Sequence, residues 1–174
     1  MNHLLTSLKF SFILFIGVFP LTSSADGGED RIFKEWYESR NSGVSAVKLQ
    51  QYNKLCGSCH FAYQPGLLPA LSWEQIIFNF DNHFGVNLNL SPVDKRTMAR
   101  YLLDNSAGHV NDDISNKILQ SFNYEGIVNR ITQTPYFVDK HSQFNSSVNS
   151  VSVGQCDGCH QNAMQGKYGL LSKP

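Results

Sequence analysis

Two copies of the pattern Cys-x-x-Cys-His constrain this chain more than any other feature. They read CGSCH from Cys56 to His60 and CDGCH from Cys156 to His160, and every cysteine of the 174 residues lies in one of them. On one helical turn, cysteines three positions apart lie on the same face, where both thiols reach the vinyl groups along one edge of a porphyrin. The histidine that follows then points its imidazole at the iron. The motifs therefore predict two covalently attached haem c groups. The attachment residues in this interpretation are Cys56, Cys59, Cys156 and Cys159.

Three other uses of paired cysteines explain the pattern less well. Cysteine pairs that bind zinc usually lie about 15–20 residues apart, whereas these two motifs begin 100 residues apart. A thioredoxin-like redox pair needs a surrounding strand–helix pattern, which is not visible here. Disulfides are common in exported proteins, but they give no reason for a histidine after both second cysteines.

Residues 1–25 have the pattern of a secretory signal peptide. Lys9 precedes an apolar run at residues 10–21, and Ser23 and Ala25 are small residues at the offsets that signal peptidase requires. An uncleaved anchor is the alternative, although the run is shorter than the roughly 20 residues that span a bilayer. We expect cleavage, export to the periplasm and no transmembrane segment in the mature chain.

The charge balance excludes some classes of partner. The chain has 14 basic and 14 acidic residues, and nucleic-acid binding usually requires a clustered basic face. The longest basic cluster is Lys95, Arg96 and Arg100. We interpret it as a solvated helix face; the alternatives are a steering site for an acidic partner and a set of partners for haem propionates.

Helical spacing selects a distal ligand for the first haem, whose proximal ligand is His60. Ser72 and Gln75 form a capping-box pattern at the start of a predicted helix that ends at Gly85. An apolar stripe runs along this helix, and His83 extends the stripe by one turn. We therefore predict that His83 binds the first haem iron.

Two further helices complete a first predicted domain. One runs from about Ser45 into the first motif, and the other begins after Ser91, with proline at its first position, and runs to about Asn105. Met98 lies on the apolar side of the second of these helices, so we assign it to the core rather than to the iron. This order of elements is that of a small class I cytochrome c domain, predicted over residues 26–108.

The second motif has few residues after it, so its haem must be enclosed mainly by the preceding segment of a second domain, residues 109–174. An acidic helix start precedes Ile114 and Ile118, and Thr134-Pro135 opens a short helix. Phe137 and His141 are four positions apart on that helix and share a face.

His141 is the predicted distal ligand of the second haem, opposite His160. His109, in a polar turn, is the alternative ligand, whereas Met164 follows the second motif too closely to reach the far face of the ring. Arg130 is a candidate partner for a propionate of this haem. Residues 142–152, rich in serine and asparagine, are predicted to form a loop.

Several stretches resemble one family, the soluble dihaem cytochromes c of the sphaeroides type. They are GSCHFAYQPGLLPALSW, NHFG, RITQTPYFVDKH and CDGCH, in that order, and the resemblance extends over residues 51–169. Gln64 departs from it, since proline is expected there. The resemblance implies an all-α fold, with a class I cytochrome c-like domain followed by a smaller, loop-rich helical haem-binding domain. It also implies two six-coordinate haems, one with His60 and His83 and the other with His160 and His141.

An iron with imidazole on both faces exchanges an electron without binding substrate, so the sequence predicts an electron carrier and not an enzyme. The alternative is a haem enzyme or a gas-binding haem protein with one open or displaceable distal ligand. A tandem cytochrome with methionine ligands would need a full domain after the second motif. The family resemblance alone implies two redox partners, a monohaem oxygen-binding cytochrome and a membrane cytochrome b. We further expect the small second domain to be disordered without its haem.

Overall fold

A computed structural model of the chain describes residue 31 and residues 43–122, 126–143, 147–148 and 151–169. The predicted signal peptide, residues 1–25, lies outside these ranges. Among the helices in the described ranges, none combines the length and the apolar character needed to cross a bilayer.

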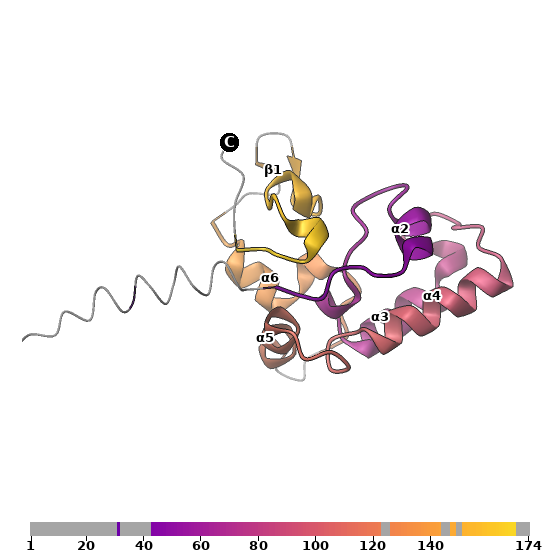
Figure 1. Ribbon diagram of the computed structural model, residues 1–174, viewed down its shortest axis with the longest axis horizontal. Helices are drawn as coiled ribbons and strands as arrows, with labels where there is room; N and C mark the ends of the chain where they lie inside the picture. Colours follow the sequence, from indigo (N-terminus) through magenta and orange to yellow (C-terminus); the bar gives the residue numbers. More distant parts are fainter. Residues whose placement is uncertain (1–30, 32–42, 123–125, 144–146, 149–150, 170–174) are drawn as a thin grey trace, which may run out of the picture.

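The described fold is mostly helical, as predicted (Figure 1). Its α-helices are α2 (Gln50–Cys56), α3 (Ala70–Phe78), α4 (Pro92–Asp104), α5 (Asp113–Ser121) and α6 (Pro135–Lys140). Short 3-10 helices lie at Pro65–Leu67, Phe80–Asn82, Ile131–Gln133, Cys156–Gly158 and Ala163–Gln165. Two short antiparallel strands, β1 (Ser147–Val148) and β2 (Val151–Ser152), pair within the segment predicted to be a loop.

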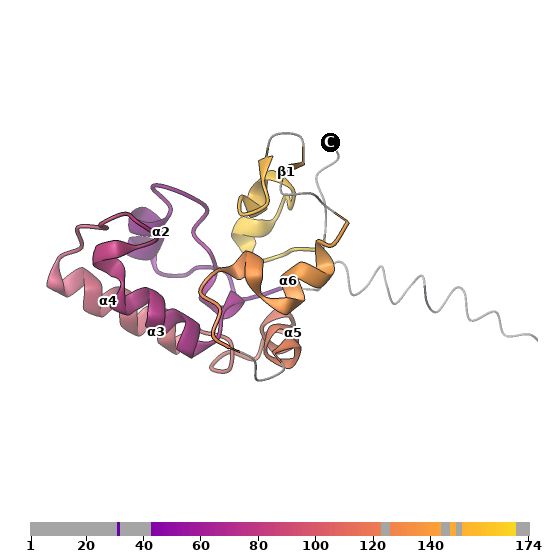
Figure 2. The same ribbon diagram turned by 180° about the vertical axis from the view of Figure 1, so that it is seen from behind.

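Helix α4 is the longest of these helices, and it begins where local sequence predicts. The Ser91 side chain accepts a hydrogen bond from the backbone N–H of Asp94, and Pro92 occupies the first helical position. Met98 and Leu102, one turn apart, are buried where α4 packs against α3. Figure 2 shows α3 and α4 alongside each other. The assignment of Met98 to the core is therefore confirmed.

Helix α3 begins earlier than its predicted cap at Ser72. The Pro69 carbonyl accepts hydrogen bonds from the backbone N–H groups of Ser72 and Trp73, so the first turn already exists at Ala70. The Ser72 side chain is buried rather than capping the helix. The predicted capping box was wrong because the helix is capped at Pro69, whose carbonyl accepts the first helical bonds three residues before the predicted cap.

The first helix begins later than predicted, at Gln50 rather than near Ser45. The backbone N–H of Ser45 donates to Asp112 Oδ2 at 2.7 Å, and its hydroxyl donates to Asp112 Oδ1 at 3.1 Å. The N–H of Val44 donates to the Gly166 carbonyl at 2.8 Å. These long-range bonds hold the segment extended, so tertiary structure overrides the local helical pattern.

One hydrophobic core spans the predicted boundary at residue 108. Ile114 and Ile118 of α5 and Ile131 are buried together with residues of the first half. The remaining buried members of this core are Val44, Tyr52, Ala62, Leu67, Leu68, Trp73, Ile76, Phe80, Met98 and Leu102. The second half therefore packs on the first, while the division at residue 108 remains a prediction.

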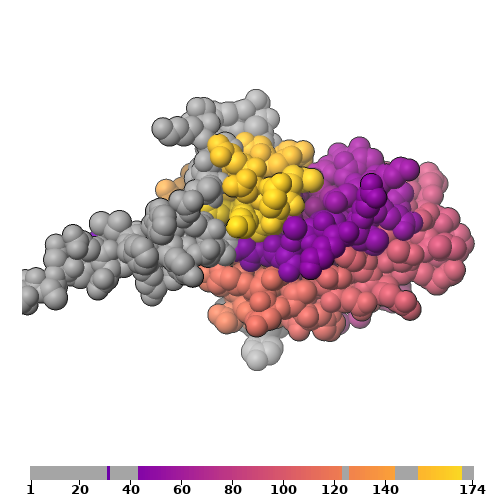
Figure 3. Space-filling model, in the orientation of Figure 1, coloured from indigo at the N-terminus to yellow at the C-terminus, as the bar shows by residue number. Residues whose placement is uncertain are grey.

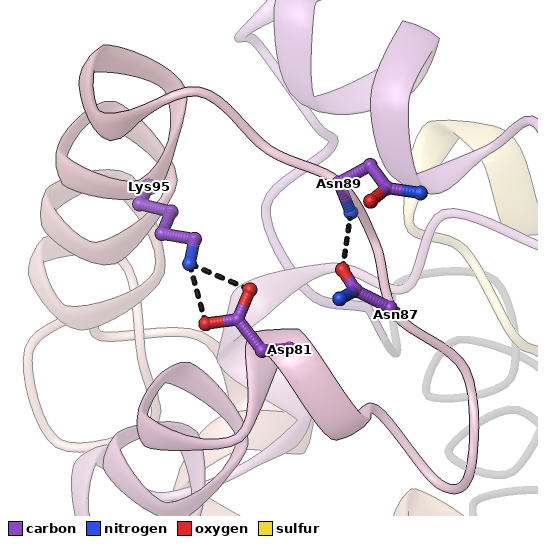
Figure 4. A network of polar contacts seen from close by, with 4 residues as sticks. All are labelled: Asp81, Asn87, Asn89 and Lys95. Atoms are coloured by element: carbon purple, nitrogen blue, oxygen red, sulfur yellow. Dashed lines mark hydrogen bonds and ion pairs between the residues drawn. The ribbon is translucent and has the colours of Figure 1, made fainter.

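On the surface, an ion pair connects the segment after α3 to α4, and a hydrogen bond lies within the loop that precedes α4 (Figure 4). Lys95 Nζ lies 2.6 Å from Asp81 Oδ2, and the backbone N–H of Asn89 donates to Asn87 Oδ1 at 2.8 Å. Both partners of the ion pair are solvent-accessible, and exposed pairs of this kind usually contribute about 0–1 kcal/mol. Lys95 therefore forms an ion pair within the molecule.

Candidate haem-binding site

The first motif begins at the last residue of α2. Cys56 is partly buried, Cys59 is exposed and His60 is partly buried. His60 Nδ1 lies 2.7 Å from the Phe61 carbonyl oxygen. A carbonyl oxygen can only accept, so Nδ1 carries the hydrogen and Nε2 keeps a lone pair for a metal.

His83 lies in a tight turn and not on a continuous helix. Helix α3 ends at Phe78, and the chain passes through the 3-10 helix Phe80–Asn82 before His83. His83 and Val86 exchange two backbone hydrogen bonds, of 2.7 and 3.1 Å, around a two-residue turn. Phe84 and Gly85 form the turn with φ of 51° and 96°.

The predicted helix to Gly85 was wrong for a local reason. The run Asn79-Phe80-Asp81-Asn82 contains three residues with poor helix propensity. The backbone N–H of Asn79 closes α3 on the carbonyls of Ile76 and Ile77. Glycine adopts positive φ at little cost, so Gly85 supports the hairpin turn rather than ending a helix.

The second motif forms one turn of 3-10 helix by itself. The N–H groups of Cys159 and His160 both donate to the Cys156 carbonyl, at 3.2 and 2.8 Å. Cys156 is buried, whereas Cys159 and His160 are partly buried. This turn agrees with the expectation that the two thiols of a motif share a face.

His141 ends α6 as its C-cap residue. The Thr134 hydroxyl caps the start of this helix by accepting from the Phe137 N–H at 3.2 Å, as the Thr-Pro pattern predicts. His141 Nδ1 lies 2.9 Å from the Phe137 carbonyl oxygen. The His141 and Phe137 rings stack at 3.8 Å between centroids. The stacked Phe137 ring and this hydrogen bond together fix the orientation of the imidazole and place its hydrogen on Nδ1.

Each motif histidine faces a second histidine. The ring centroids of His60 and His83 are 6.3 Å apart, with an interplanar angle of 24°. The centroids of His141 and His160 are 6.1 Å apart, at 84°. A bond between a metal and an imidazole nitrogen is about 2 Å long, so two such bonds plus the two ring radii span roughly 6 Å. Both pairs therefore have the separation that one iron between two imidazoles requires.

Electrostatics favours a neutral imidazole at His83. Burial lowers its pKa, and the nearby charges of His60 and Arg130 lower it further. Metals bind the neutral form of histidine. The shift therefore suits a ligand role.

Two of the four thiols, those of Cys56 and Cys156, have the opposite character from reactive or zinc-binding cysteines. Burial raises the pKa of Cys56 to about 11 and that of Cys156 to about 12. Reactive cysteines and zinc ligands act as thiolates, and reactive ones often have a pKa lowered to about 3.5–7.5. All four cysteines are free of disulfides. Within the described parts of the chain, no three His, Cys, Asp or Glu side chains form a group that could hold a metal ion.

Other candidate residues lie away from the facing imidazoles. His109 is exposed, as predicted, and its Nδ1 lies 2.6 Å from the Leu103 carbonyl oxygen near the end of α4. The Arg130 guanidinium lies 4.0 Å from the centre of the Phe84 ring, which packs edge-on against His83 at 4.8 Å. Arg130 thus approaches the first site, although its place in the sequence associates it with the second.

The comparisons with known proteins agree with this arrangement. The model of the family "Dihaem cytochrome c" matches residues 52–168. This chain belongs to the dihaem cytochrome c family. Family membership confirms the predicted family, its mostly helical fold and its two covalently attached haem c groups. The assignment of individual side chains to the two haems remains a prediction.

Solved structures of this family resemble the chain along most of their length. A diheme cytochrome c from Rhodobacter sphaeroides is 28% identical, with a TM-score of 0.63 over 71% of this chain and 99% of that one. A diheme cytochrome type c from Shewanella baltica is 31% identical, with a TM-score of 0.51 over 66% of this chain and 82% of that one. A comparison with curated proteins returns no match.

Sequence reasoning did not identify two tyrosines of this dihaem cytochrome c that lie beside its motif histidines. The Tyr63 ring is 5.2 Å from the His60 ring, and the Tyr168 ring is 5.4 Å from the His160 ring. The available sequence signal for them was Gln64, which departs from the family pattern. Gln64 follows Tyr63, is fully buried and accepts a hydrogen bond from the Tyr168 hydroxyl.

Proposed function

We propose that this dihaem cytochrome c is a periplasmic electron carrier in which His60 and His83 bind one haem iron and His160 and His141 bind the other. The observation that carries the proposal is the facing of two imidazole pairs at 6.3 and 6.1 Å. A haem iron with nitrogen on both faces exchanges one electron and offers no vacant position to a substrate.

The chain's own residues support this role by orienting the ligands. Backbone carbonyls accept from Nδ1 of His60 and of His141, so in both imidazoles Nε2 is the nitrogen without a hydrogen, which is the form that binds a metal. The two hydrogen bonds of the turn at His83 restrict the position of the ligand that has the least helical support. Fixed ligands reduce the structural change that accompanies electron exchange.

Absorption spectroscopy and carbon monoxide test the proposal on the purified holoprotein. We expect two haems per chain by mass, low-spin spectra in both oxidation states and no carbon monoxide complex of the reduced protein. A high-spin band, peroxide turnover or rapid carbon monoxide binding in the wild type would instead support the haem enzyme or gas-binding alternative.

Three histidine variants make the test specific to each site. His83→Ala and His141→Ala should each open one iron, giving one high-spin haem that binds carbon monoxide. His109→Ala is the matched control, because it removes an exposed imidazole that hydrogen-bonds the end of α4. If His109→Ala opens an iron and His83→Ala does not, the proposed ligand set is wrong.

The location and the partners form part of the same proposal. The signal-peptide pattern supports export to the periplasm. From the family resemblance we propose redox partner proteins, namely a monohaem oxygen-binding cytochrome and a membrane cytochrome b. Stopped-flow mixing of the reduced chain with each oxidised partner would measure the electron exchange directly.

A further inference from the structure

The segment Phe61–Gln64, directly after the first motif, also forms one wall of the second site. Phe61 is buried in a small cluster with Cys156 and Ala163. The Tyr63 hydroxyl donates to the Gly154 carbonyl at 2.7 Å, two residues before the second motif. Figure 3 shows the yellow surface of the C-terminal part of the described chain in contact with the indigo-to-purple surface of its N-terminal part.

Gln64 makes the most buried connection in this wall. Its side chain has no solvent exposure, and its Nε2 donates to the Ala163 carbonyl at 2.7 Å. Its Oε1 accepts a hydrogen bond from the Tyr168 hydroxyl. The amide therefore uses its donor and its acceptor on two residues of the second half.

Both hydrogen bonds of Gln64 lead to the motif histidine of the second site. The Ala163 N–H donates to the His160 carbonyl at 3.0 Å. The Tyr168 ring packs against the His160 ring at 5.4 Å between centroids, in an edge-on arrangement. Gln64 thus holds one residue that bonds the His160 backbone carbonyl and one whose ring contacts the His160 imidazole.

The backbone around this contact leaves little room for adjustment. Gly166 has φ of 74°, and a Cβ atom on it would lie 1.9 Å from the Val44 carbonyl oxygen. The N–H of Val44 donates to the Gly166 carbonyl at 2.8 Å. A buried amide in such a place holds its partners in one arrangement, because breaking either hydrogen bond leaves a buried polar group unsatisfied.

We propose that Gln64 is a positioning residue of the second haem site, which holds Ala163 and Tyr168 against His160 and thereby sets the potential of the second haem. The inference rests on the proposed bis-histidine electron carrier. Burial and hydrogen bonding around a haem tune its potential. Loosening this wall admits water, which stabilises the ferric form, so the potential of the second haem falls.

Two variants remove the contact with little change to the backbone. Residue 64 has φ of −62° and ψ of 134°, which proline adopts, so Gln64→Pro removes the amide and preserves the chain path. Tyr168→Phe removes the hydroxyl that donates to Oε1 and keeps the ring beside His160. Ser115→Ala is the matched control, since it deletes another fully buried hydrogen bond, the one that its hydroxyl donates to the Gly66 carbonyl at 2.8 Å.

Redox titration of the holoproteins, followed by electron paramagnetic resonance at each haem, tests the proposal. The second haem is identified as the one whose signal changes in His141→Met. We expect Gln64→Pro and Tyr168→Phe to shift the midpoint potential of the second haem to more negative values and to leave that of the first haem unchanged. Ser115→Ala should shift neither potential.

Three outcomes decide against the proposal. It is overturned if both variants titrate like Ser115→Ala, if the two haems shift equally, or if only the first haem shifts. Should Gln64→Pro fail to yield holoprotein, Tyr168→Phe alone decides by the same criteria. A failure of the bis-histidine assignment would be visible in the wild type by carbon monoxide binding, whereas a failure of this inference appears only in the variants.

Discussion

The two histidine pairs have nearly the same spacing but very different supports. Around the first pair, α3 and α4 pack through fully buried residues such as Met98 and Leu102. The second motif is a single turn, and α6, which ends at His141, contains no fully buried residue. The comparison teaches that the second site has less packing of its own and rests on the first half, so we expect it to depend more strongly on its haem.

The ligand planes differ as well. The imidazole planes of His60 and His83 are nearly parallel, at 24°, and those of His141 and His160 are nearly perpendicular, at 84°. Stacking on Phe137 fixes the ring of His141, and the Tyr168 ring contacts that of His160. Different local packing therefore gives the two proposed ligand pairs, which are chemically identical, two geometries.

The largest expected effect comes from removing one haem at a time. Cys156→Ser with Cys159→Ser should lose one haem and leave the second half without stable structure, while the core of the first half persists. Cys56→Ser with Cys59→Ser should disturb both halves, because the second rests on the first. Mass spectrometry and hydrogen exchange resolved by segment measure this asymmetry. An unchanged, cooperatively folding second half without its haem would contradict it.

The difference in ligand planes predicts two distinct low-spin signals from the oxidised protein. Parallel imidazoles interact with the same iron d orbital and separate a pair of levels, whereas perpendicular ones leave the pair nearly degenerate. Electron paramagnetic resonance should therefore show a rhombic signal for the first haem and a more anisotropic one for the second. His141→Met should remove only the anisotropic signal. Two identical rhombic signals would contradict the 84° geometry.

A smaller effect, on the free energy of unfolding, should distinguish two methionines that lie in different environments. Met98 has no solvent exposure in the main core, so Met98→Ala should destabilise the fold by about 3 kcal/mol. Met164, near the second motif, is 49% exposed, and Met164→Ala should change stability by no more than about 0.5 kcal/mol. Denaturant unfolding of the holoproteins, followed by circular dichroism, compares them. Equal losses would show that the second half has a core of its own.

The smallest expected effect is electrostatic, at Arg130. Its guanidinium lies over Phe84, beside the distal ligand of the first haem, so Arg130→Gln should lower the potential of that haem. The side chain is exposed, and its contribution should be no more than about 1 kcal/mol, or roughly 40 mV for one electron. Arg96→Gln, which removes the same charge from an exposed position of α4, is the control. A shift of the second haem alone would restore the sequence-based association of Arg130 with that site.

Local signals predicted those elements whose ends are set within one turn. Ser91 before Pro92 and Thr134 before Pro135 each cap a helix through a hydrogen bond to a backbone N–H three residues on. The predicted helix starts at Ser72 and Ser45 were wrong. The Pro69 carbonyl accepts the first bonds of α3, and the Asp112 carboxylate accepts from Ser45 and keeps it out of a helix. The helical path to His83 was also wrong, yet the histidine still faces His60, because a turn delivers it there.

The order of cysteines and histidine within one turn is chemistry encoded locally, so the sequence alone determined that the chain carries two covalently attached haems. Which second histidine lies opposite each motif, and at what angle, depends on contacts between residues far apart in the chain. The same holds for Gln64, whose two bonds reach Ala163 and Tyr168 about a hundred residues later. Only the tertiary structure decides these placements, because side-chain packing and long-range hydrogen bonds have no fixed spacing in sequence.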